Sequence, residues 1–314
     1  MLRSLVGSEM CIRDRFWTSL LSYLDISYSG NENPAISESE NIYDKKFFPN
    51  LKLSYSENII NNLNSIPILY VNEIGFKKYY SKEEVIHKVN LVAKYLKSIG
   101  IKKGDRVVGI VTNNAETLIS FLAVNSIGAV WSSCSPDFGE QAILDRFSQI
   151  EPKILFYSSN YMYGGKKFKI LEKIKNVESK LNTLEVSICI DYSQKDKSFI
   201  DEKLNFFEEN NRELSELSFE RCQFNDPMYI LYSSGTTGKP KCIVHNTGGP
   251  LIQHLKEQQL HCEICENDKL FYFTTCGWMM WNWLISGLAS KATVVLYEGC
   301  LLYTSPSPRD FEAS

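Results

Sequence analysis

Short β-rich runs alternate with amphipathic stretches along the chain from about Phe76 onward. Residues 107–111 form the clearest run, and a helical pattern follows at 115–127. Such alternation predicts parallel strands joined by crossover helices, and therefore an α/β fold with parallel-rich sheets flanked by helices. The predicted strands are 107–111, 129–133, 154–157, 186–190, 228–232, 269–273 and 293–297, and a second helix is predicted at 140–149.

The links between these elements indicate where a ligand would bind. Right-handed crossovers put helices on both faces of a sheet and strand-end loops along one edge, where ligands bind in such folds. Residues 112–114, Thr-Asn-Asn, are interpreted as a helix cap, because these side chains accept hydrogen bonds from free amides. Residues 158–165 are predicted to be a connecting loop, and the polar segment 191–201 to be exposed.

The composition is that of a globular protein with a sizeable core. The chain has 314 residues and is 44% hydrophobic, which is enough for one large α/β unit or two domains. Lys plus Arg number 34 and Asp plus Glu 37, so the net charge is −3, and neither half carries a basic stripe. Nucleic acid is therefore not the indicated partner.

The sequence predicts neither a membrane span nor an export signal. The longest apolar run, 118–131, is interrupted by Ser120, Asn125 and Ser126 and is too short to cross a bilayer. The start of the chain has charges at 13–15 and lacks the apolar region of a signal peptide. We therefore expect a cytoplasmic protein with no membrane partner.

The nine cysteines are scattered through apolar stretches, which is typical of buried free thiols in a reducing compartment. Cys262 and Cys265 form the single close pair. One CxxC motif without a second supplies too few ligands for a closed tetrahedral zinc site. We therefore predict no metal site formed by cysteine.

A loop rich in hydroxyl groups, glycine and lysine follows the apolar run 228–232. Residues 233–241 read Ser-Ser-Gly-Thr-Thr-Gly-Lys-Pro-Lys. Gly235 and Gly238 allow the backbone to turn and approach a ligand closely, while hydroxyls and amides can converge on phosphate oxygens. A Walker A loop needs four residues between its glycines and a hydroxyl residue after the lysine, but here two residues separate the glycines and Pro240 follows Lys239. A flexible Ser/Gly linker is the alternative, which Pro240 and the preceding strand disfavour.

Residues 229–241 resemble the signature loop of the adenylate-forming superfamily, which includes acyl-CoA synthetases, adenylation domains of peptide synthetases and luciferases. Further segments resemble one branch of it, the acetoacetyl-CoA synthetases. These segments are 47–49, 55–58, 126–139, 145–153 and 274–283, and together with the loop they span almost all of 16–299. The resemblance implies the large N-terminal domain of the adenylate-forming fold, in partial form.

The resemblance also implies roles for particular residues. The loop would hold the β- and γ-phosphates of ATP together with Mg²⁺, with Lys239 in a variable slot of the motif. The implied nucleotide contacts are Ser233, Ser234, Gly235, Thr236, Thr237, Gly238, Lys239 and Lys241. Gly277 and Trp278 would line the pocket for the carboxylate substrate and the approach of the CoA thiol, although an apolar helix start would also explain Trp278. His245 is interpreted either as a residue facing the loop or as a structural histidine.

The implied reaction joins acetoacetate to CoA. The carboxylate attacks the α-phosphorus of ATP, pyrophosphate leaves, and the CoA thiol then displaces AMP from the acyl-adenylate. Such an enzyme would be a ligase of fatty acid and lipid metabolism acting on small molecules. An acetyl- or propionyl-CoA synthetase is one alternative, and a non-catalytic nucleotide-binding module is another; the sequence leaves the oligomeric state open.

The expected organisation has several parts. Residues 16–66 form a lead-in region, 67–225 a first α/β subdomain, and 226–299 the start of a second one with the phosphate loop. Residues 4–15 and 300–310 resemble translated sequencing adapter, so 1–15 and 300–314 are expected to be non-native segments.

Several family elements do not occur before Gly299. They are the Tyr-Gly-x-Thr-Glu motif beside adenine, the ribose-binding Asp segment, the hinge and the C-terminal catalytic lysine. We therefore assign no catalytic residue within the chain, and we expect this N-terminal fragment to be inactive alone.

Overall fold

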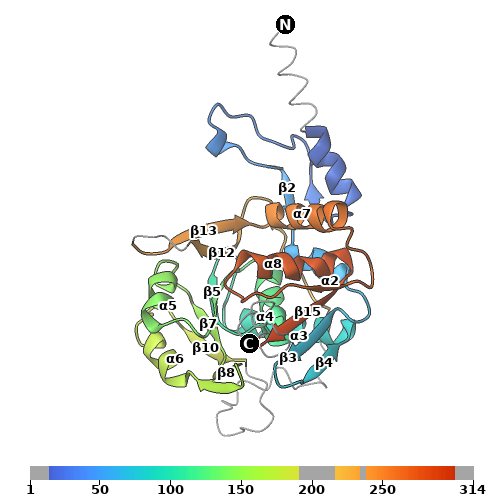
Figure 1. Ribbon diagram of the computed structural model, residues 1–314. Helices are drawn as coiled ribbons and strands as arrows, with labels where there is room; N and C mark the ends of the chain where they lie inside the picture. Colours follow the sequence, from blue (N-terminus) through green and yellow to red (C-terminus); the bar gives the residue numbers. More distant parts are fainter. Residues whose placement is uncertain (1–13, 191–215, 234–237, 301–314) are drawn as a thin grey trace, which may run out of the picture.

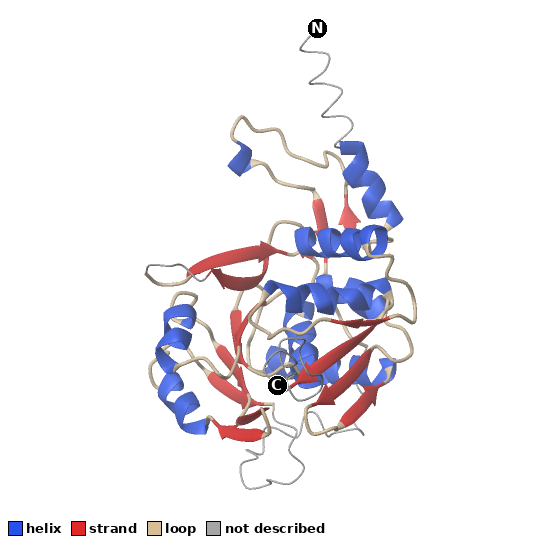
Figure 2. Ribbon diagram, in the orientation of Figure 1, coloured by secondary structure: helices blue, strands red, loops and turns tan. Residues whose placement is uncertain are grey.

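The computed structural model describes residues 14–190, 216–233 and 238–300 (Figure 1). The chain ends expected to be non-native and the polar segment after 190 lie mostly or entirely outside these ranges. Within them, two larger sheets pack with helices on their faces, in agreement with the predicted α/β class (Figure 2).

The main sheet has six strands in the order β10, β7, β5, β6, β12, β13, of which the last runs antiparallel to its neighbour. Most of its parallel strands are buried continuous runs of apolar residues, as expected for strands covered on both faces. In chain order they are β5 (Arg106–Ile110), β6 (Val130–Cys134), β7 (Ile154–Tyr157), β10 (Val186–Cys189), β12 (Pro227–Ser233) and β13 (Lys241–Asn246).

Helices cover the main sheet on both faces. On one face, α5 (Glu140–Phe147) and α6 (Leu171–Glu178) pack on alternate strand residues such as Val108 and Ile110 (Figure 1). On the other face, every residue of α4 (Ala115–Ser126) is buried, because this helix lies between the two larger sheets. The predicted helices and strands of this region are therefore confirmed, with ends shifted by one or two residues.

A second sheet has the order β14, β15, β3, β4, with the first three strands parallel. Its strands are β3 (Ile68–Asn72), β4 (Lys77–Tyr80), β14 (Lys269–Phe271) and β15 (Thr293–Glu298). The associated helices are α3 (Lys82–Ser98), α7 (Gly248–Lys256), the π-helix Glu257–His261, α8 (Met279–Ser286) and the 3₁₀ turn Gly287–Ser290.

Segments from distant parts of the chain share both sheets. β12 pairs with β6, and β15 pairs with β3, so each sheet joins residues from both sides of position 225. The sheets thus group the chain differently from the linear division into 67–225 and 226–299, which stays a prediction about domain boundaries.

The N-terminal region forms a small layer of its own beside the sheets. Residues 14–23 are helical, and β2 is the centre of a three-stranded antiparallel sheet. Two guanidinium nitrogens of Arg221 donate to the Glu57 carboxylate, at 2.6 and 2.8 Å. This ion pair links the N-terminal region to a segment more than 160 residues later in the chain. The elements of this layer are β1 (Ser29–Gly30), the 3₁₀ turn Ile42–Asp44, β2 (Leu51–Leu53) and β11 (Cys222–Gln223). The helix that follows β2, α2 (Tyr55–Asn61), packs instead against α4, where the Ser56 hydroxyl donates to the Leu122 carbonyl at 2.7 Å.

The loop predicted at 158–165 is wrong for half of its length, the four residues that form a strand. Residues Asn160–Tyr163 form β8, which pairs with β9 (Lys166–Lys169) as a hairpin. Gly164 and Gly165 both have positive φ and make the two-residue turn, while Tyr161 stacks on Phe168 with ring centres 5.0 Å apart. A glycine pair between aromatic residues is the local signal for this hairpin.

Candidate functional site

The carboxyl ends of the parallel strands define one edge of the main sheet. From β5 the chain passes through α4 to β6 on one side, whereas from β7 it passes through α6 to β10 on the other. A crevice forms where neighbouring strands send the chain in opposite directions, and such crevices bind ligands in open α/β sheets. Those expected site residues that the structure describes lie at this edge.

The predicted phosphate loop joins the last two strands of the sheet. Ser233 ends β12 and is paired with Lys241, the first residue of β13. Gly238 has φ +90°, a left-handed conformation that glycine adopts without strain. Residues Ser234, Gly235, Thr236 and Thr237 lie outside the described part of the chain.

Two features of the described part of this hairpin bear on anion binding: one contact that positions it and two exposed lysines. The side-chain amide of Gln149, just after α5, donates to the Pro240 carbonyl at 2.9 Å and ties the hairpin to the neighbouring helix. Lys239 and Lys241 are both exposed. Their charges can therefore reach a phosphate group at the sheet edge.

The second expected segment packs directly on β6. A Cβ atom at Gly277 would lie 3.2 Å from the Ser133 carbonyl oxygen and 3.3 Å from Cα of Cys134. The Ser133 hydroxyl donates to the Cys276 carbonyl at 2.7 Å. The residue that follows, Trp278, stands at the N-cap of α8 and is 57% exposed. The backbone here is held tightly, while the indole ring remains accessible.

Strand order brings the two segments to adjacent positions. β6 and β12 are neighbours, with Trp131 opposite Tyr229 and Ser132 opposite Ile230. Neighbouring strands lie about 5 Å apart. The end of β6 that Gly277 contacts is therefore beside the end of β12 where the hairpin loop begins. The sequence did not predict this adjacency, because periodicity carries no information on strand order.

Residues after β5 also hold the Gly277 segment, a role that the sequence did not indicate. Asn114 is the N-cap of α4, and its Oδ1 accepts from the Thr117 amide at 2.8 Å, which confirms the predicted cap. Its neighbour Asn113 instead accepts from the indole N–H of Trp281 at 2.9 Å. The Cys276 thiol donates to the Thr112 carbonyl at 3.3 Å.

His245 is the next-to-last residue of β13, the edge strand of the main sheet. It stacks on Tyr229, with ring centres 4.7 Å apart, and is four residues along β13 from Lys241. Partial burial lowers the pKa of its imidazole. Its surroundings thus favour the structural interpretation of this residue.

The cysteines at the site are poor nucleophiles. Burial raises the pKa of the Cys134 thiol to about 12 and raises that of Cys276 as well. Both therefore stay protonated near neutral pH. Cys134, Cys222 and Cys276 are buried as expected, whereas Cys189 and Cys242 are only half buried. In the described ranges, no three His, Cys, Asp or Glu side chains gather to hold a metal.

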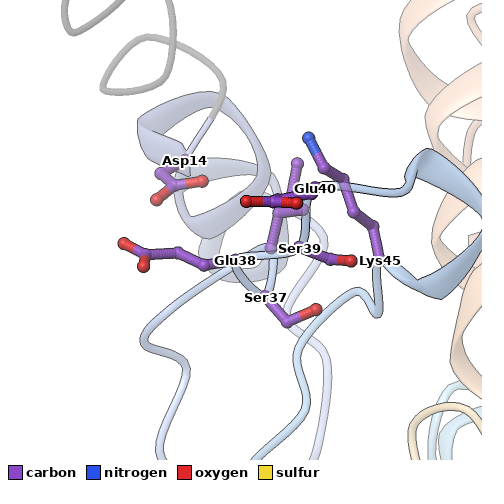
Figure 3. Close-up of a pocket in the computed structure, with 7 residues that line it drawn as sticks. Asp14, Ser37, Glu38, Ser39, Glu40 and Lys45 are labelled. Atoms are coloured by element: carbon purple, nitrogen blue, oxygen red, sulfur yellow. The ribbon is translucent and has the colours of Figure 1, made fainter.

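A separate pocket lies in the N-terminal layer, and Figure 3 shows its polar side chains. Three of them are acidic, Asp14, Glu38 and Glu40, and one is basic, Lys45. The full lining is Asp14, Ile36, Ser37, Glu38, Ser39, Glu40 and Lys45. This charge balance disfavours the binding of a triphosphate in this pocket.

Comparison with known proteins identifies the class. Residues 68–309 match the model of a family described as AMP-binding enzyme. The chain belongs to this family.

Two relatives and one solved structure show which members of this family the chain is similar to. The chain is 39% identical over 298 residues to acetoacetyl-coenzyme A synthetase of Rhizobium meliloti (strain 1021), covering 91% of the chain and 44% of that protein. It is 40% identical over 304 residues to acetoacetyl-CoA synthetase of Mus musculus, covering 93% and 45%. The solved structure of acetoacetyl-CoA synthetase from Streptomyces lividans matches with a TM-score of 0.84 and 34% identity, covering 92% of this chain and 45% of that one. The chain thus spans less than half the length of these relatives.

The resemblance to the acetoacetyl-CoA synthetases and the adenylate-forming α/β fold are both confirmed. Across the described ranges, no helix is both long and apolar enough to cross a bilayer.

Proposed function

We propose that this chain forms the triphosphate-binding and acid-binding part of an ATP-dependent acetoacetate–CoA ligase. The observation that carries the proposal is the adjacency of two strand ends: the Ser233–Lys241 hairpin leaves β12, and Gly277 packs on the end of neighbouring β6. A reaction between a phosphate ester and a carboxylate needs both groups held a few ångströms apart. Family membership supports the same conclusion.

The hairpin would bind the β- and γ-phosphates. Hydroxyls and backbone amides of the loop would donate to the phosphate oxygens, with Lys241 and the more variable Lys239 adding positive charge. The proposed contacts are Ser233, Ser234, Gly235, Thr236, Thr237, Gly238, Lys239 and Lys241. Gly277 and Trp278 would line the pocket for the acid.

The chemistry needs activation because a carboxylate is a poor acyl donor. One carboxylate oxygen forms a bond to the α-phosphorus of ATP, the bond to the bridging oxygen breaks, and pyrophosphate leaves with its electron pair. The CoA sulfur then bonds to the acyl carbon, AMP departs, and the thiol proton is released. In the first step the protein mainly positions reactants and stabilises charge on the leaving phosphates.

Mg²⁺ fits this site as a companion of ATP. The described residues around the hairpin offer the Ser233 hydroxyl and two lysines, but no cluster of carboxylates that would hold a divalent ion alone. Phosphate oxygens would supply most of its ligands. When bound with the triphosphate, Mg²⁺ neutralises part of the negative charge.

Acetoacetate is the proposed acid, and the relatives' names support it. The test is pyrophosphate exchange catalysed by the product of the full reading frame, with acetoacetate and acetate compared at equal concentration. We expect exchange to be faster with acetoacetate. A preference for acetate would replace the substrate assignment with a short-chain acyl-CoA synthetase, and ATP binding without exchange on any acid would favour a non-catalytic nucleotide-binding module.

The cellular setting follows from this chemistry. The substrates and products are water-soluble small molecules, so we propose that the enzyme works in the cytoplasm and supplies acyl-CoA to fatty acid and lipid metabolism. Fractionation of the producing cells, followed by detection with an antibody, would test the location.

Replacement of Lys241 tests the phosphate role. Lys241→Met removes one charge from an exposed hairpin position. We expect the Michaelis constant for ATP to rise roughly tenfold, as for the loss of one charge-assisted contact, with little change for the acid. Lys180→Met, at another exposed lysine outside the site, is the control and should leave both constants unchanged. An unchanged constant for ATP in Lys241→Met would contradict the assignment.

A further inference from the structure

A buried hydrogen bond links the end of β5 to α8. Nε1 of Trp281 donates to Oδ1 of Asn113 at 2.9 Å, and the two residues are 0% and 6% exposed. An indole N–H only donates, so the carboxamide must present its oxygen to Trp281. This contact therefore fixes the orientation of the Asn113 side chain as well as the position of the ring.

Further contacts hold the preceding residues against the same strand ends. Ser133 Oγ accepts from Nε1 of Trp131 at 3.0 Å and donates to the Cys276 carbonyl at 2.7 Å. The Cys276 thiol donates to the Thr112 carbonyl. Residues 276–281 are thus held by hydrogen bonds at both ends, at Cys276 and at Trp281, and the exposed Trp278 lies between them.

We propose that Asn113 is a positioning residue for acid binding: through Trp281 it holds the start of α8, and with it Gly277 and Trp278, at the edge of the main sheet. The inference rests on the proposed function. Asn113 has no described contact with the phosphate hairpin. Its loss should therefore change the binding of the acid and spare the binding of ATP.

The start of α4 is held by the two neighbours of Asn113, namely Asn114 and Thr112, and not by the Asn113 side chain. The helix cap is made by Asn114, and the Thr117 hydroxyl donates to the Thr112 carbonyl at 2.8 Å. The Asn113 side chain takes no part in either contact. Its replacement consequently leaves the start of α4 intact, which separates a positioning role from a role in folding.

Asn113→Ala removes the acceptor, and Asn113→Asp keeps an acceptor oxygen at the same position. Asn125→Ala is a matched control. Asn125 is 5% exposed and stands at the other end of α4, and its side chain donates to the Phe121 carbonyl at 2.9 Å.

Two measurements are needed. Indole N–H exchange of Trp281 by ¹⁵N NMR in the 314-residue chain reports the contact, and Michaelis constants for acetoacetate and ATP in the full-length product report its effect.

For Asn113→Ala we expect Trp281 N–H exchange to accelerate and the Michaelis constant for acetoacetate to rise at least tenfold, with the constant for ATP within twofold of wild type. Asn113→Asp should recover a substantial part of both effects, and Asn125→Ala should show neither. If Asn113→Ala does not fold, Asn113→Leu, of similar size and without an acceptor, replaces it.

Two results would overturn the inference. One is faster Trp281 exchange with an unchanged constant for acetoacetate, which would make the contact purely structural. The other is an equal rise in both constants. A wild-type enzyme that activates no acid at all is a different result, because it removes the proposed function itself and the inference with it.

Discussion

The backbone at Gly277 runs so close to β6 that an added Cβ atom would crowd the strand, at 3.2–3.3 Å from its nearest atoms. Its two nearest neighbours, the Ser133 carbonyl and Cα of Cys134, are main-chain atoms of a buried strand and cannot rotate away. We therefore expect Gly277→Ala to lower the free energy of unfolding by about 1–3 kcal/mol, the usual range for overpacking. Urea denaturation of the chain measures this change.

A second glycine provides the control for Gly277→Ala. Gly139 precedes α5 and has an ordinary φ of −66°, and a Cβ atom added to it would meet no neighbouring atom within 4 Å. Gly139→Ala should therefore lower stability by no more than about 1 kcal/mol, because Gly139 is the N-cap of α5 and alanine is a poorer cap than glycine. Equal losses in the two variants would contradict the tight packing of Gly277 on β6.

Single residues also show where sequence reasoning ends. The cap made by Asn114 could be predicted, because its partner is three residues away. The contact of Asn113 with Trp281 joins residues 168 positions apart and has no local pattern. For the same reason, Gly277 could be assigned to the site only through a resemblance to known proteins.

At the scale of elements, three helices meet at a buried hydroxyl. Ser286 Oγ on α8 lies 2.8 Å from Nδ1 of His254 on α7 and 2.8 Å from the hydroxyl of Tyr55 on α2. Burial, with a smaller contribution from nearby His245, lowers the pKa of His254 to about 4. Burial therefore favours the neutral imidazole at this contact.

This helix contact predicts a pH dependence of stability. The pKa of His254 is lower in the folded chain than the ordinary 6.5, so the unfolded chain binds the proton more readily. Its stabilising contribution is complete above about pH 6.5 and is lost as the pH falls toward 4. Urea denaturation from pH 7 to 4.5 should show falling stability, with a shallower slope in His254→Asn. An identical slope in that variant would argue against His254 as the source.

Elements differed in how well their sequence predicted them. β7 has the predicted bounds, because a buried parallel strand is a continuous apolar run. β13 was missed: its residues Lys-Cys-Ile-Val-His-Asn are exposed or half exposed throughout, so no hydrophobic period marks the strand. The hairpin of β8 and β9 was missed because its glycine pair was interpreted as part of a loop.

At the scale of the whole molecule, both sheets end in strands with exposed apolar side chains. On β13 these are Ile243 and Val244, and on and after β14 they are Phe271, Tyr272 and Phe273. Within the described ranges, no strand pairs with the outer edge of either one. Exposed apolar edge strands pair readily with other chains.

We accordingly expect the 314-residue chain to self-associate as its concentration rises. Sedimentation velocity should show a larger average mass at higher concentration, and Val244→Lys on β13 should reduce this effect, because a charge on an edge strand opposes pairing. Ile74→Lys is the control, since Ile74 is equally apolar and 68% exposed but lies in the turn between β3 and β4. A chain that stays monomeric at all concentrations would refute the expectation.

The pairing of β3 with β15 has a consequence for how the chain is made. β3 is a central strand of the second sheet, yet its parallel partner is synthesised more than 200 residues later. At about 5–20 residues per second, a ribosome needs roughly 10–40 s to cover that distance. During this interval Ile68 and Leu69, both buried in the finished protein, have no sheet to cover one side of their strand. A nascent chain of this sequence is therefore a natural client for a chaperone that binds short apolar strands.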